Sequence, residues 1–92
     1  MVQVRKRTNG ISYSMYNRNE HERGHIHVQY AGKAGQAEFA ASIDIQTQQV
    51  IEGSLPAKQL REAVRWIESH QAELLEMWRI RNQPNGIQRI EE

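Results

Sequence analysis

Apolar and polar residues alternate along the first half of this chain. An apolar side chain recurs at every second position in three segments, 11–16, 25–30 and 38–45. A period of two places these side chains on one face of a β-strand. A shorter apolar segment, 50–53, follows a polar turn and would add a fourth strand. The first half therefore predicts three or four antiparallel strands.

The second half has the period of a helix instead. Apolar residues follow at helical spacing over 60–67, and the stripe resumes at 74–78 after a polar gap. One continuous helix over 56–82 would be about 40 Å long, which exceeds the width expected of so small a domain. We therefore expect a break near residues 69–70 and two packed helices. The tail, 84–92, would attach to the core or add a short edge strand.

Strands followed by helices predict the α+β class. We expect a three- to four-stranded antiparallel sheet with two helices packed on one face, which leaves the other face open. All 92 residues would form a single domain, organised as a flexible basic arm (1–8), the sheet (9–53), the helical pair (54–83) and the tail (84–92).

Composition limits the class of protein further. The chain has no cysteine, so disulfides and thiolate chemistry are excluded, and its net charge is +1. No apolar run approaches the roughly 18 residues that a membrane span needs, and no apolar segment follows the basic residues 5–7 as in a secretory leader, so we expect neither. We expect a cytoplasmic protein. The charge is uneven, because residues 1–36 carry +4 and residues 37–92 carry −3. This asymmetry suggests that the first half faces an anionic partner, although an uneven solvated surface would look the same.

Three of the four histidines lie within seven residues, at His21, His25 and His27. The segment from His21 to His25 matches the H-E-x-x-H pattern of zinc proteases, which requires a helix. Gly24 lies inside the segment, and a predicted strand follows it directly. We therefore reject the zinc-protease interpretation.

His25 and His27 are two residues apart on a predicted strand. Their side chains should lie on the same face, about 7 Å apart at Cα, opposite the apolar residues. Pairing apolar with apolar residues, such as Ile26 with Ile43, sets the register of the neighbouring strands. The register predicts two polar rows across the open face, Tyr16–His25–Asp44 and Ser14–His27–Ser42.

Three interpretations of this polar face stay open. Two histidines that titrate near neutrality can act as general base and general acid in phosphodiester cleavage. His21, His25 and His27 could instead bind a metal ion through three imidazoles. The histidines could also be hydrogen-bonded locally and have no function beyond structure.

The same residues resemble one small bacterial family, the domain of unknown function 4160 family. The resemblance covers roughly residues 9–90, and its most specific part is Met-Tyr, a short gap, Glu-His and then His-x-His-Val. The family usually has two prolines where this chain has Arg23 and Gly24, and this chain is longer between Tyr30 and Ile43. Members are commonly encoded beside another small protein, and the pair resembles a type II toxin–antitoxin module. The resemblance thus implies a toxin that a small antitoxin-like partner neutralises.

Our leading hypothesis is a cytoplasmic toxin that acts on RNA or another phosphate-bearing target. It needs no cofactor and no metal, and a homo-oligomer stays open. The rival is a non-enzymatic binding module that docks another protein through its helical pair and Trp78, with structural histidines. The hypothesis assigns the acid–base pair to His25 and His27, their orientation to Asp44 and Tyr16, and substrate contacts to Arg18, Glu20 and His21.

Overall fold

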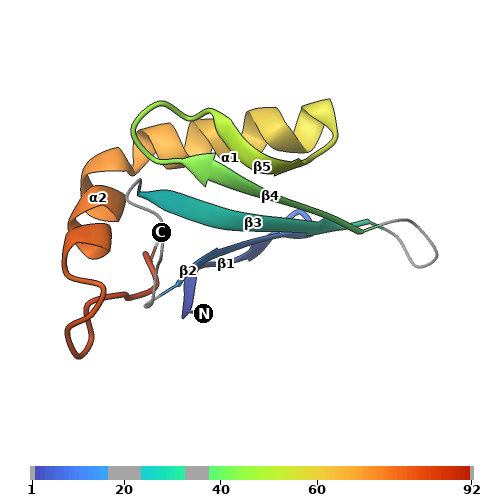
Figure 1. Cartoon of the computed structure of the whole chain (residues 1–92). Coiled ribbons are helices and arrows are strands. Elements are labelled where there is room, and N and C mark those ends of the chain that lie inside the picture. The colour runs from blue at the N-terminus through green and yellow to red at the C-terminus, as the bar shows by residue number, and fades with distance from the viewer. Residues whose placement is uncertain (1, 17–23, 33–37, 92) are drawn as a thin grey trace.

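The computed structural model describes residues 2–16, 24–32 and 38–91 of the chain. Five antiparallel strands follow one another in the sheet in chain order, and two helices complete the α+β fold (Figure 1). The expected class is confirmed, although the sheet has one or two strands more than expected. The elements are β1 (Val2–Thr8), β2 (Ile11–Met15), β3 (His25–Ala31), β4 (Glu38–Asp44), β5 (Val50–Ser54), α1 (Ala57–Ser69) and α2 (Gln71–Arg79).

Residues 2–8 do not form the expected basic arm. They form the edge strand β1, which pairs with β2 through a tight turn at Asn9 and Gly10. Both turn residues have positive φ, 53° and 78°, as hairpin turns with Asn-Gly require. Val4 is fully buried and anchors the strand on the core. The prediction was wrong because three consecutive basic residues, 5–7, interrupt the alternation of apolar and polar side chains.

The register of the central strands agrees with the sequence. Tyr13 lies opposite Val28, and Ile26 lies opposite Ile43, so apolar side chains share one face. Helix α1 covers this face with Trp66 among its buried residues, and the Trp66 and Tyr13 rings lie 4.7 Å apart. The fully buried core comprises Val4, Ile11, Tyr13, Met15, Ile26, Val28, Ile43, Ile45, Ala63, Ile67 and Leu74.

The two helices meet at His70, where the sequence predicts a break. His70 has φ −117° and ψ 22°, which are not helical values, and its backbone N–H donates to the Trp66 carbonyl at 3.1 Å. The break turns α2 to the end of the sheet where β3 begins (Figure 1). Neither helix in the described ranges is long and apolar enough to cross a membrane.

The tail attaches to the core and adds no strand within its described residues, 84–91. Ile87 and Ile90 pack, partly buried, against the core. The Ile90 N–H donates to the Val4 carbonyl at 2.7 Å, so the tail contacts the outer strand β1. Of the two expected outcomes for this segment, attachment to the core is the one observed.

Gly53 is required by the backbone of β5. Its φ is +77°, and a Cβ there would lie 2.1 Å from the carbonyl oxygen of Ala40 on β4. We expect Gly53→Ala to lower the free energy of unfolding by at least about 1–3 kcal/mol. The strain of a positive φ at alanine and the clash of its Cβ with the β4 backbone both contribute to this loss. Urea denaturation measures this loss. The neighbouring exposed variant Ser54→Ala should change stability by less than about 0.5 kcal/mol, and equal losses in both variants would contradict the prediction.

Candidate functional site

The sheet face opposite α1 carries polar side chains in rows across the strands. Ser14 lies opposite His27, and His27 lies opposite Ser42, as the sequence predicts. The row extends on both sides, because Gln3 of β1 lies opposite Ser14 and Glu52 of β5 lies opposite Ser42. We call this face the polar sheet face. Its central row, which crosses all five strands, is Gln3–Ser14–His27–Ser42–Glu52.

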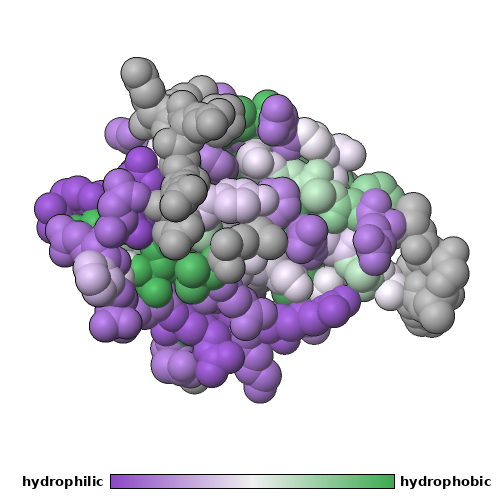
Figure 2. Space-filling view, turned by 60° about the horizontal axis from the view of Figure 1, so that its bottom comes forward, coloured by the Kyte–Doolittle hydropathy of each residue, from purple (hydrophilic) through white to green (hydrophobic). Residues whose placement is uncertain are grey.

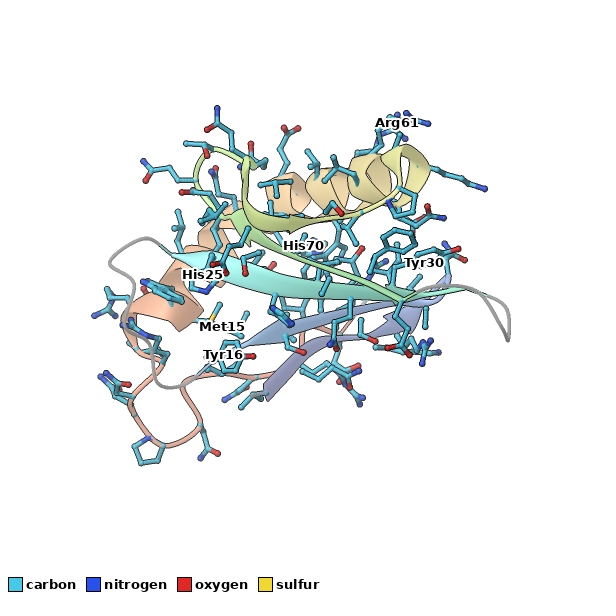
Figure 3. All side chains as sticks on the ribbon, turned by 45° about the vertical axis from the view of Figure 1, so that its right-hand side comes forward. Met15, Tyr16, His25, Tyr30, Arg61 and His70 are labelled. Carbon is cyan, nitrogen blue, oxygen red and sulfur yellow. The ribbon has the colours of Figure 1, made fainter. Side chains whose placement is uncertain are left out.

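His25 is not on the open part of this face, contrary to our expectation. It lies directly opposite Asp44, as predicted, but its exposed fraction is only 7%. The ring centroid of Trp78 on α2 is 5.1 Å from that of His25 (Figure 3 shows His25 at the end of β3 beside α2). Gly24 gives the indole room, because a Cβ at this position would lie 3.2 Å from the Trp78 Cγ. Trp78 thus reaches around the end of the sheet, a position that the helical period alone does not reveal.

Asp44 holds the turn between β4 and β5. Its exposed fraction is 3%, and its Oδ1 accepts the backbone N–H groups of Gln46 and Thr47 at 2.7 and 2.9 Å. A carboxylate that accepts two backbone donors at the end of a strand stabilises the following turn. Asp44 therefore faces His25 across the strands and also fixes the local backbone.

Tyr16 lies beside His27, and the strand ladder does not pair it with His25 as predicted. Strand β2 ends at Met15, and its ladder with β3 ends at the pair of Ser14 and His27, so Tyr16 leaves the strand register. Its ring centroid is 5.7 Å from that of His27, and its exposed fraction is 40%. The accessible groups near one another are thus Tyr16 and His27. In the row beside His27, Ser42 is half-buried and Ser14 is buried.

The environment of His27 favours its neutral form. Partial burial lowers the pKa of His27 below the ordinary value of 6.5, and the nearby His25 lowers it further. Removal from water disfavours the charged imidazolium, and a second positive charge repels it. Near pH 7 the His27 ring therefore has a free lone pair and can accept a proton.

The lowered pKa of His27 predicts a pH dependence of stability. In the unfolded chain the pKa returns to about 6.5, so the unfolded state binds more protons than the folded state below that value. We expect the free energy of unfolding to fall as the pH decreases from about 7 to about 5. The contribution of His27 is thus complete above the unfolded pKa and is lost on acidification. Denaturation at several pH values should show a shallower decline in His27→Gln, and identical slopes would contradict the assignment.

The remaining predicted residues, Arg18, Glu20 and His21, lie outside the described residues. Among the residues that are described, no group of three or more histidine, aspartate or glutamate side chains could hold a metal ion. The three-histidine interpretation depends on His21, so the structure does not test it.

Two features of this face were missed in the sequence. Gln3 and Glu52, which complete the central row, belong to β1 and to β5, the strands with the weakest alternation. The spacing of Val2 and Val4 would have placed Gln3 on the polar side.

In the view of Figure 2, hydrophilic residues predominate on the molecular surface, and hydrophobic residues gather in separate areas. Such a surface suits a polar ligand better than a large apolar one.

The fold and this site define a small α+β protein with a polar sheet face and an accessible histidine at its centre. The chain belongs to the DUF4160 family, a domain of unknown function, whose family model matches residues 10–79. The matched segment includes strands β2 to β5 and both helices. Comparisons with curated proteins and with solved structures gave no match.

Proposed function

We propose that this chain is the toxin of a type II toxin–antitoxin pair and that it cleaves RNA in the cytoplasm through its polar sheet face. The observation that carries the proposal is the position of His27. The pKa of His27 is lowered, its ring lies 5.7 Å from that of Tyr16, and Ser14 and Ser42 lie opposite it on the two neighbouring strands. The toxin–antitoxin part of the proposal comes from the family resemblance.

RNA supplies its own nucleophile, the 2′-hydroxyl group, so a protein can cleave it with a base and an acid alone. In the proposed reaction, neutral His27 takes the proton of the 2′-hydroxyl, and the 2′-oxygen attacks the adjacent phosphorus. The bond from phosphorus to the 5′-oxygen breaks, and an acid donates a proton to that oxygen. The products are a 2′,3′-cyclic phosphate and a 5′-hydroxyl end.

The structure changes the roles that we assign to the other residues. His25 is buried against Trp78, so we assign the acid to Tyr16, whose phenolic hydroxyl group can donate a proton. His25, which faces Asp44, becomes a positioning residue that also lowers the pKa of His27. Arg18, Glu20 and His21 keep their proposed role as substrate contacts in the segment between β2 and β3.

Expression in growing cells tests the proposal. Wild-type protein should slow growth, and His27→Gln should not, at equal amounts of soluble protein. Co-expression of the small protein encoded beside it should restore growth. Undiminished toxicity of His27→Gln, or a wild-type protein that is harmless without the neighbour, would refute the proposal.

A second candidate function is a non-enzymatic protein-binding module. Two structural roles favour this function. His25 is buried against Trp78, and Asp44 accepts hydrogen bonds that stabilise the turn between β4 and β5. In that case the partner protein should bind wild type and His27→Gln with equal affinity, and purified wild type should leave RNA intact.

A further inference from the structure

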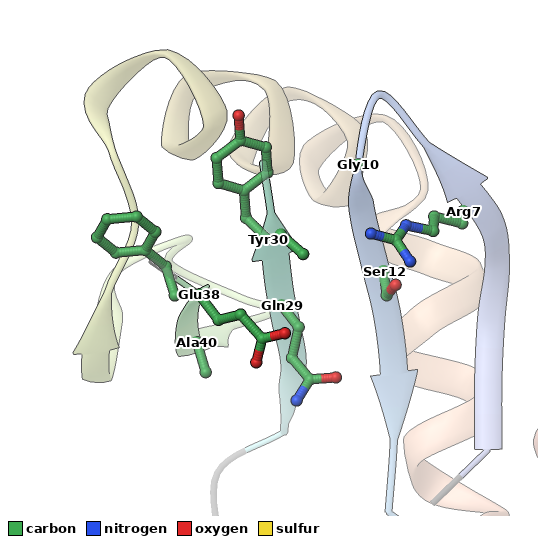
Figure 4. A pocket seen from close by; sticks show the side chains of 9 residues that line it. Arg7, Gly10, Ser12, Gln29, Tyr30, Glu38 and Ala40 are labelled. Carbon is green, nitrogen blue, oxygen red and sulfur yellow. The ribbon is translucent and has the colours of Figure 1, made fainter. Parts of the chain in front are cut away.

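A pocket of about 380 Å³ lies at the other end of the polar sheet face, away from α2 (Figure 4). Its volume is at the lower end of the range of small-molecule sites. Ser12, Gln29 and Ala40, which lie opposite one another in register, form a row across it. The small side chains of Ala31 and Ala40 and the absence of one at Gly10 leave the hollow open. The row is adjacent to that of His27, about 7 Å away along the strands.

Opposite charges stand on the two sides of this pocket. Arg7 comes from β1 and Glu38 from β4, strands whose backbones are about 14 Å apart in the sheet. Figure 4 shows both side chains pointing into the pocket, with Gln29 and Ser12 between them. Neither Arg7 nor Glu38 forms an ion pair with another described residue. The pocket thus presents the N–H donors of the Arg7 guanidinium on one side and the two carboxylate oxygens of Glu38 on the other.

We propose that this pocket binds a guanine base. Guanine has two acceptors, O6 and N7, on one edge, and a guanidinium binds this pair in the commonest specific contact between proteins and bases. Its N1–H and 2-amino groups form a pair of donors on another edge, which matches the two oxygens of a carboxylate. Adenine presents an acceptor, N1, where guanine presents N1–H, so Glu38 would repel it. The Gln29 amide and the Ser12 hydroxyl add donors and acceptors between the two charges.

This inference deepens the proposed function and rests on it for its biological meaning. A guanine in the pocket would lie one row from His27, so the cleaved phosphate would be next to a guanosine. The pocket would then set the sequence at which the RNA is cut, while His27 and Tyr16 carry out the reaction.

Calorimetric titration of the intact protein with GMP, AMP and free arginine tests the pocket. GMP should bind at least about tenfold more tightly than AMP, since a good bidentate contact discriminates between bases by about this much or more. Glu38→Gln should lose the preference for GMP. The matched variant Glu68→Gln, which changes an exposed glutamate on α1, should keep it.

The outcomes separate the pocket from the proposed reaction, because the titration needs no cleavage. Four results would each overturn the guanine site. GMP could bind no more tightly than AMP, fail to bind, or bind less tightly than arginine, or the preference for GMP could survive Glu38→Gln. A preference for GMP that Glu38→Gln removes supports the site even if the protein cleaves no RNA. Cleavage of RNA without preference for guanosine would leave the proposed reaction standing and refute the pocket.

Discussion

Replacing Trp66 with alanine is expected to lower the free energy of unfolding by about 3–5 kcal/mol. The indole has an exposed fraction of only 6% and joins α1 to the sheet. Its ring centroid lies 4.7 Å from those of Tyr13 and His70, and the Arg5 guanidinium lies 5.2 Å above the ring. The variant therefore loses apolar burial, two aromatic contacts and a cation–π contact together.

Urea denaturation followed by circular dichroism measures this loss. The control is Leu75→Ala on α2, whose side chain is 37% exposed and which should cost far less. A loss of 3–5 kcal/mol is large for a domain of this size, so Trp66→Ala could be unfolded before urea is added. Trp66→Phe keeps a ring in place, and we expect it to show a smaller, measurable loss. If Trp66→Phe and Leu75→Ala are both as stable as wild type, the result contradicts the role of Trp66 in packing α1 on the sheet.

Replacing His27 with glutamine is expected to reduce the rate of RNA cleavage by about 10²- to 10⁴-fold, the usual contribution of a general base. Glutamine keeps a polar side chain of similar length but cannot exchange a proton near neutral pH. The control Lys58→Gln changes an exposed residue on α1, away from the polar sheet face, and should leave the rate unchanged. Single-turnover rates on a labelled RNA give the comparison, and a loss of less than about tenfold would exclude His27 as the base.

The lowered pKa of His27 determines how the cleavage rate should change with pH. The base must be neutral to accept a proton, and the pKa of His27 is lowered below 6.5. The rate should therefore persist as the pH decreases to 6.5 and fall only below it. A decline that is centred above 6.5 would show that another group is the base.

The central sheet could be predicted because two physical constraints agree there. The period of two separates the faces of β2, β3 and β4, and pairing apolar with apolar residues then sets the register. Ile26 opposite Ile43 and His27 opposite Ser42 follow directly. The edge strand β1 was not predicted, because Arg5, Lys6 and Arg7 break the alternation on which the argument depends.

The candidate site could be predicted only in part, because burial depends on how the helices turn. His25 shares a face with His27 in the sequence pattern, yet only the bend at His70 brings Trp78 over it. The pocket between Arg7 and Glu38 likewise requires β1 to be a strand, since Arg7 would otherwise lie in a flexible arm. Neither the bend angle nor this pairing can be read from a hydrophobic period.

The most direct test of the central claim is the chemistry of the RNA ends. Purified wild-type protein, incubated with a labelled single-stranded RNA and a metal chelator, should produce 2′,3′-cyclic phosphate and 5′-hydroxyl ends. His27→Gln, folded to the same extent by circular dichroism, should produce almost none. Intact RNA after incubation with folded wild-type protein, or the same products at the same rate from His27→Gln, would contradict the assignment of the polar sheet face as a ribonuclease site.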